Sequence, residues 1–216
     1  MRQGLSAVVL VAALLSGRTA LAEDPPTEAP AETTPEVETD DGGMEGNIQF
    51  YIGQMYLGDV WKPLDRPATF GVEADFAPKG SPVHVALATS ISGDSGDVVT
   101  PYFGKTGSVA DGFIEFSAGF VWLPVKRGVA RPYLGAGVLT MFAGIDNGAN
   151  AWNGGDSDHS FGFYGTAGLY FKVGDSFNIG FDGRIVRGTS FNFAGAEVDA
   201  DYERVSMLFG FSWGEQ

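Results

Sequence analysis

Five charged residues lie on segments of the chain in which every second position is polar or small. They are Glu73, Glu115, Asp182, Arg184 and Arg204. Guanidinium groups and carboxylates form strong, charge-assisted hydrogen bonds with each other. An ion that leaves water without a partner costs several kcal/mol, so these residues must pair if the segments enclose a narrow space. Such an ion-pair network could exchange partners and admit small solutes, or it could stay fixed and fill the space.

The two histidines, His84 and His159, are the other side chains suited to acid–base chemistry. His84 lies among alanines and serines, which is typical of an interior histidine with satisfied hydrogen bonds. His159 is flanked by Asp158 and Ser160, an arrangement that a hydrolase could use. Catalysis would need an oriented base beside its nucleophile. Adjacent residues of a strand point to opposite faces, so this pair predicts no enzyme.

Acidic residues also gather near the end of the chain, at Glu197, Asp199, Asp201 and Glu203. Their oxygen atoms could bind divalent cations, but their spacing fits no calcium-binding loop. We interpret them as solvated loop charge and predict no metal site and no cofactor.

The composition excludes several classes of protein. The 216 residues include 13 basic and 27 acidic side chains, a net charge of −14, and no cysteine. The acidity argues against nucleic-acid binding, which depends on Lys and Arg. The absence of cysteine excludes disulfides and thiolate zinc sites. Glycine, at 32 residues, is about twice as frequent as average.

Two N-terminal segments differ from the rest of the chain. Residues 1–22 have a basic start, an apolar stretch and an Ala-Leu-Ala end, which predicts a signal peptide. Residues 23–43 contain eight acids, four prolines and no base, which predicts a disordered acidic linker. We therefore expect the folded domain to comprise residues 44–216.

Eight segments of the folded domain alternate between two kinds of side chain, as strands do. Seven of them, starting near Phe70, Val83, Ile114, Leu134, Phe161, Phe177 and Val205, place 35 mostly large apolar residues on one face and no charge. The other face is small or polar. The eighth segment, 47–57, is apolar on both faces, because Phe50 and Ile52 alternate with Tyr51 and Met55. Its register stays open.

Side-chain volume decides which face is inside. An eight-stranded barrel is just wide enough for side chains to fill, so the large apolar residues do not fit within it. We therefore predict an all-β, eight-stranded antiparallel up-and-down transmembrane β-barrel whose apolar face contacts lipid. The alternative is a lipocalin-like barrel with inverted faces, which would place Phe120, Phe163 and Phe209 in the interior.

Long and short connections alternate along the chain. The connections near 92–112, 144–160 and 187–203 are long, and those near 77–82, 124–132 and 172–176 are short. Bacterial outer-membrane barrels have short periplasmic turns and longer extracellular loops. The pattern predicts that both termini are periplasmic. It also places an aromatic girdle on the periplasmic side, formed by Trp122, Phe171, Phe177 and Trp213.

Residues 131–138, Arg-Pro-Tyr-Leu-Gly-Ala-Gly-Val, resemble a strand opening common in small outer-membrane barrels, and 168–184 is similar to their penultimate hairpin. The resemblance, to eight-stranded barrels of the OmpA/OmpX type, covers residues 46–213. It implies a Gram-negative outer membrane, contact with lipid and lipopolysaccharide, insertion by the barrel-assembly machinery, and a monomer. One departure is that Gly214, Glu215 and Gln216 follow Trp213, whereas family members commonly end on an aromatic residue.

Three hypotheses for function follow. The leading one is a non-enzymatic outer-membrane protein with a mostly plugged lumen and a structural or surface-interaction role. The second is a narrow pore for small solutes. The third is a lipid-modifying hydrolase.

Overall fold

The computed structural model describes residues 42–99, 106–125, 128–146, 156–193 and 195–214. The predicted signal peptide, and the linker up to residue 41, lie outside the described residues. Within the described part of the chain, no helix is long and apolar enough to cross a bilayer.

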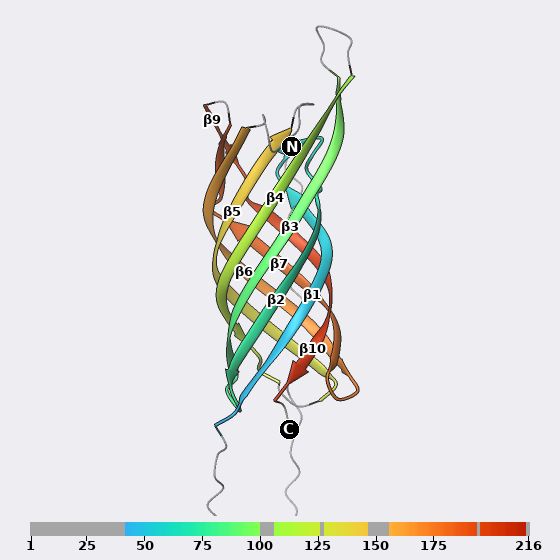
Figure 1. Ribbon diagram of the computed structural model, residues 1–216, viewed down its shortest axis with the longest axis vertical. Coiled ribbons are helices and arrows are strands. Elements are labelled where there is room, and N and C mark those ends of the chain that lie inside the picture. Colours follow the sequence, from blue (N-terminus) through green and yellow to red (C-terminus); the bar gives the residue numbers. More distant parts are fainter. Residues whose placement is uncertain (1–41, 100–105, 126–127, 147–155, 194, 215–216) are drawn as a thin grey trace, which may run out of the picture. The chain divides into compact units, whose positions relative to one another are not determined.

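Eight strands form a closed antiparallel barrel in the order β1-β10-β7-β6-β5-β4-β3-β2 (Figure 1). Two further strands, β8 and β9, pair in a separate two-stranded sheet. The barrel strands are β1 (Met44–Leu57), β2 (Ala68–Pro78), β3 (Val83–Val99), β4 (Thr106–Trp122), β5 (Ala130–Asp146), β6 (Asp156–Val173), β7 (Phe177–Arg187) and β10 (Tyr202–Trp213). The predicted eight-stranded barrel is confirmed.

The closing pair of strands settles the register that the sequence left open. β1 pairs with β10 from Gly46↔Trp213 to Leu57↔Tyr202. Tyr51 and Met55 are buried inside the barrel, while Ile52 is exposed on its outer face. The first strand therefore follows the same rule as the other seven.

Large apolar side chains cover the outside of the barrel. Phe120, Phe163 and Phe209 are 63%, 70% and 38% exposed. The lipocalin-like alternative, which needs these residues inside, is therefore wrong. An exposed apolar surface of this extent, on a barrel without open edges, is typical of a protein that contacts lipid.

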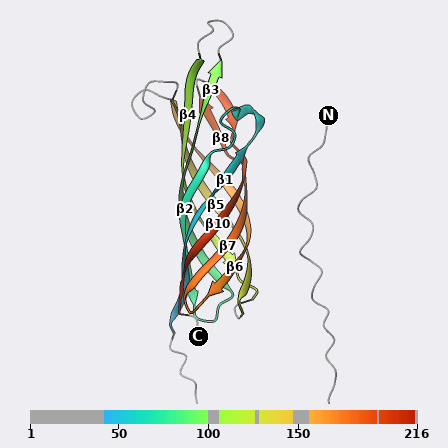
Figure 2. The same cartoon turned by 90° about the vertical axis from the view of Figure 1, so that its right-hand side faces the viewer.

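The long connection predicted near 92–112 is instead largely strand, and strand also extends into both ends of the one predicted near 144–160. β3 and β4 stay paired as far as Val99↔Thr106, although β2 pairs with β3 only as far as Ala68↔Gly93. The β3–β4 ribbon thus projects beyond its neighbours (Figures 1 and 2). β5 and β6 likewise pair out to Ile145↔Asp156. Beyond the apolar belt these strands no longer alternate apolar with polar residues, so hydrophobic periodicity does not mark them.

The third long connection, between β7 and β10, contains β8 (Ser190–Phe193) and β9 (Ala196–Asp199). The connection between β1 and β2 contains a short 3-10 helix, η1 (Asp59–Trp61). We call the end of the barrel that carries these elements the long-connection end. The opposite, short-connection end has the connections 79–82, 123–129 and 174–176.

The interior is not filled by small polar residues alone, as the sequence suggested. Tyrosine rings lie over interior glycines: a Cβ added to Gly71 would lie 2.3 Å from Cζ of Tyr51, and one added to Gly168 would lie 2.3 Å from Cζ of Tyr133. The interior glycines therefore make room for aromatic rings.

Candidate functional site

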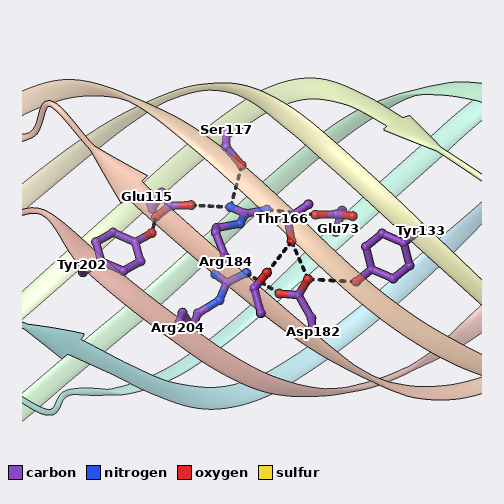
Figure 3. Close-up of polar contacts among 10 residues, drawn as sticks. Glu73, Glu115, Ser117, Tyr133, Thr166, Asp182, Arg184, Tyr202 and Arg204 are labelled. Carbon is purple, nitrogen blue, oxygen red and sulfur yellow. Dashed lines mark hydrogen bonds and ion pairs between the residues drawn. The ribbon is translucent and has the colours of Figure 1, made fainter. Parts of the chain in front are cut away.

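Arg184 of β7 lies at the centre of a buried polar network that crosses the barrel (Figure 3). Its Nη1 donates to Oε1 of Glu115 at 2.8 Å and to Oγ of Ser117 at 3.2 Å. Its Nη2 donates to Oε2 of Glu73 at 3.1 Å. One guanidinium group therefore joins carboxylates from β2 and β4 to β7.

Arg204 of β10 holds the second ion pair less tightly. Its Nη2 lies 3.5 Å from Oδ1 of Asp182, whose Oδ2 accepts hydrogen bonds from Tyr133 at 2.9 Å and Thr166 at 2.5 Å. Nε and Nη1 of Arg204 are buried without a hydrogen-bond partner among the described residues. Arg204 is thus the less satisfied of the two cations.

Tyrosines complete the network. Tyr202 donates a hydrogen bond to Oε2 of Glu115. The guanidinium carbon of Arg184 lies 4.2 Å from the ring centroid of Tyr164, and that of Arg204 lies 4.2 Å from that of Tyr51. A cation over an aromatic face is stabilised by about 2 kcal/mol when both are removed from water.

All five residues predicted for the lumen network take part in these contacts. Sequence reasoning placed Ser117 and Thr166 on the inward face without assigning them to the network, and it did not assign the tyrosines Tyr51, Tyr133, Tyr164 and Tyr202. A signal was present, because Tyr202 precedes Arg204 by two positions and so shares its face. The sequence analysis instead assigned large side chains to the lipid-facing side, because of their volume.

A second group of buried side chains, mainly apolar, lies at the long-connection end of the lumen. We call this buried cluster the apolar plug; it comprises Met55, Leu57, Trp61, Phe113, Leu139, Met141, Ala143, Tyr164, Val186, Phe191, Ala200 and Tyr202. Trp61 of η1 is 6% exposed and makes edge-to-face contacts with Phe113 and Phe191, at 5.4 and 6.3 Å between ring centroids. Its Nε1 donates to the carbonyl oxygen of Asp199 at 2.7 Å. The plug therefore ties two connections to the barrel wall.

The predicted aromatic girdle lies on the outer face near the short-connection end. Trp122, Phe171, Phe177 and Trp213 are all exposed there, at or near strand ends. Phe177 and Phe211 make an edge contact, with 5.5 Å between their ring centroids.

The two histidines have different surroundings. His84 is buried, and its Nδ1 lies 2.6 Å from Oδ1 of Asp75. His159 is exposed on the outer face and stacks on Phe142. Ser160 is buried and accepts a hydrogen bond from the backbone N–H of Ser190 at 2.9 Å. His159 and Ser160 thus point to opposite faces and do not form a nucleophile–base pair.

Exposed charges at the long-connection end pair locally. Nζ of Lys62 lies 2.7 Å from Oδ1 of Asp59, and this contact lowers the pKa of Asp59. Arg187 lies 3.3 Å from Glu203 and 3.9 Å from Asp201. Over the residues that the structure describes, no group of three or more His, Asp or Glu side chains is arranged to hold a metal ion.

These features define an antiparallel barrel with a lipid-type outer surface and a lumen that holds a buried ion-pair network and a buried apolar cluster. No protein-family model matches the sequence, and no curated protein matches it either. The structure is similar to solved outer-membrane barrels.

Neisserial surface protein A (NspA) is 11% identical over 79% of this chain and 97% of its own, with a TM-score of 0.52. OprG of Pseudomonas aeruginosa is 13% identical over 79% and 94%, with a TM-score of 0.52. Ail, the attachment invasion locus protein of Yersinia pestis, is 13% identical over 79% and 99%, with a TM-score of 0.50. At these identities the similarity is one of fold.

Proposed function

We propose that this chain is a non-enzymatic outer-membrane β-barrel protein with a closed lumen and a structural or surface-interaction role. The observation that carries the proposal is that two adjoining groups of buried side chains lie in the lumen, the ion-pair network around Arg184 and the apolar plug around Trp61. A barrel filled in this way suits an anchor for its connections better than a channel.

The proposed location is the outer membrane of a Gram-negative cell, with the termini and the short connections in the periplasm. The exposed apolar belt and the unequal connection lengths support this placement. The proposed partners are outer-membrane lipid, lipopolysaccharide and the barrel-assembly machinery, with the protein as a monomer.

The proposed surface role belongs to the long-connection end. The β3–β4 ribbon and the β8–β9 hairpin extend the chain there. Two proteins of similar fold are named as a surface protein and an attachment invasion locus protein. An interaction role for these projecting elements is the corresponding proposal for this chain.

Planar-bilayer recording tests the closed lumen directly. The refolded protein is expected to insert, as shown by heat-modifiable gel mobility of the same sample, and to give no discrete conductance steps. Stable openings in the wild-type protein would contradict the proposal.

The second candidate, a narrow pore, is favoured by one observation, the weak pairing of Arg204. With a single ion-pair contact, at 3.5 Å, and two nitrogen atoms without a hydrogen-bond partner among the described residues, Arg204 is the charged member of the network most easily moved. A pore controlled by the network predicts openings whose frequency changes in Glu115→Gln and Arg184→Gln. A contaminating porin predicts no change in either variant.

The hydrolase hypothesis receives no support from the geometry of His159. Its ring packs against Phe142 and Phe161 on the outer face, while the nearest serine in sequence faces inward. Lipid A deacylation or peptide cleavage that is lost in His159→Ala would revive it.

A further inference from the structure

Two carboxyl groups face each other where the β3–β4 ribbon leaves the barrel. Asp94 of β3 and Asp111 of β4 are cross-strand partners, one position beyond the last pair that joins β2 to β3. We call residues 92–95 and 110–113, which are paired with each other, the ribbon base. The apolar belt ends on these strands at Ile91 and Ile114, since the next outward positions are glycines. The two carboxyl groups therefore lie outside the membrane-spanning part of the barrel.

Asp111 is buried although only one of its two carboxyl oxygen atoms is hydrogen-bonded. The residue is 8% exposed. Its Oδ1 accepts a hydrogen bond from the backbone N–H of Asp94 at 2.7 Å, while Oδ2 has no hydrogen-bond partner among the described residues. A buried carboxylate without full compensation is costly, and such a group usually takes up a proton instead. The geometry therefore favours a neutral Asp111 as long as the ribbon base is closed.

The charge that faces Asp111 is negative. Cross-strand partners share a face of the sheet, so the half-buried Asp94 is on the same inward side from β3. From β5 the partner is Ile145, and Asp146, the next residue, belongs to the opposite face. Like charges directly opposite each other destabilise a strand pair. Burial raises the pKa of Asp111 to about 7; the charge of Asp94 adds to this effect, and the backbone hydrogen bond from Asp94 opposes it.

We propose that Asp94 and Asp111 form a pH-sensitive contact that controls the ribbon base. With a proton on Asp111 the base stays closed; when Asp111 releases this proton to water, repulsion by Asp94 and the cost of a buried charge open the base. The use of such a control rests on the surface role proposed for the long-connection end, because the ribbon is one of its projecting elements. The closed lumen does not enter the argument.

The direction of the pH effect follows from the two states of Asp111. In the open state the carboxyl group is in water, where its ordinary pKa is 3.8, whereas in the closed state its pKa is about 7. The closed state therefore binds the proton more tightly. Its stabilisation is complete below about pH 4 and is lost as the pH rises towards about 7. These two values predict that the ratio of closed to open ribbon base falls about tenfold between about pH 6 and pH 8.

Hydrogen–deuterium exchange of the refolded protein tests the proposal, with labelling times corrected for the intrinsic pH dependence of amide exchange. Protection of the ribbon base is expected to fall about tenfold between about pH 6 and pH 8. Asp111→Asn should give the same protection at both pH values, because an amide side chain does not ionise. The matched control is Asp97→Asn, since Asp97 is in the same ribbon but three positions from Asp94, on the opposite face. This variant should keep the wild-type pH dependence, and heat-modifiable gel mobility shows whether each variant has folded.

Carbon-13 NMR of the aspartate carboxyl groups tests the wild-type protein without any variant. Asp111 is expected to titrate near pH 7. The proposal is overturned if Asp111 titrates below about pH 5, if wild-type protection of the ribbon base is the same at the two pH values, or if folded Asp111→Asn keeps the wild-type pH dependence. None of these results bears on the conductance test of the closed lumen, so each proposal can fail without the other.

Discussion

Arg184 shows how single residues hold this lumen together. Its guanidinium group is 1% exposed, pairs with two carboxylates and lies against the ring of Tyr164. Removing one partner of a buried pair is costly because the other charge is left without compensation. The importance of Arg184 therefore comes less from the strength of its ion pairs than from the two carboxylates that would remain.

Replacing Arg184 by methionine is expected to lower the free energy of unfolding by about 3–5 kcal/mol, since Glu73 and Glu115 lose their cation. Guanidinium-induced unfolding in lipid vesicles, followed by tryptophan fluorescence, measures the change. Arg187→Met is the matched control, because Arg187 is 53% exposed and its ion pairs contribute at most about 1 kcal/mol. Equal losses of stability in the two variants would show that Glu73 and Glu115 do not depend on the charge of Arg184.

Gly71 is a position at which the fold leaves no room for a side chain. Gly71→Ala would place a Cβ against the ring of Tyr51, and overpacking of this kind costs about 1–3 kcal/mol. The same unfolding measurement applies. Gly165→Ala is the control, because Gly165 has no neighbouring atom within 4 Å of an added Cβ. In the double variant with Tyr51→Ala, part of the loss caused by alanine at position 71 should disappear, and part should remain because the added Cβ would also lie 2.6 Å from the backbone oxygen of Thr89. No recovery at all in the double variant would show that the ring of Tyr51 is not what excludes a side chain there.

At the scale of elements, the connection between β1 and β2 contributes a buried aromatic residue to the interior of the barrel. η1 places Trp61 in the apolar plug, and the indole N–H donates to the backbone carbonyl of Asp199 at the end of β9. Phe191 of β8 meets the same ring from the other connection. Two segments that the sequence marks only as loops therefore contribute to the core.

Trp61→Ala is expected to cost about 3–5 kcal/mol, the usual range for removing a buried aromatic residue. It should also expose the connection 58–67 to proteases, because the main anchor of η1 is lost. Limited proteolysis of the protein in vesicles measures this effect. Val60→Ala, in the same helix but 66% exposed, should leave the cleavage rate unchanged. Equal protection of the two variants would mean that the plug does not hold this connection.

The sequence predicted the barrel and its outward face because the apolar belt imposes a two-residue period on every strand. It also placed Glu115, Arg184 and Arg204 together, since buried charges must pair. It did not predict the tyrosines over glycines, because which ring covers which glycine depends on the stagger of neighbouring strands. Nor did it predict the plug, because Trp61 and Phe191 have no periodic context that marks them as buried.

At the scale of the whole molecule, the barrel reverses the distribution of side chains found in water-soluble proteins. Large residues face outward, whereas the charged residues with most to lose from desolvation face inward and pair. The stability of this arrangement depends on the surrounding solvent as much as on internal packing.

Phe181→Arg, near the middle of β7, should therefore lower the free energy of unfolding in vesicles by about 2–4 kcal/mol, as expected for a cation at the midplane of a bilayer. Val129→Arg provides the comparison. Val129 is similarly exposed but lies in a connection at the short-connection end, so its replacement should have little effect. An equal loss of stability in the two variants would argue against an apolar belt in contact with the bilayer.

The pairing of β1 with β10 also bears on the order in which the chain can fold. This pair joins residues that are 145 (Leu57↔Tyr202) to 167 (Gly46↔Trp213) positions apart, so the ring cannot close before the last strand arrives. Until then Glu115 lacks its hydrogen bond from Tyr202, and Asp182 lacks its contact with Arg204. Closure therefore joins the two open edges and completes the polar interior in one step, which favours late, cooperative assembly over strand-by-strand insertion.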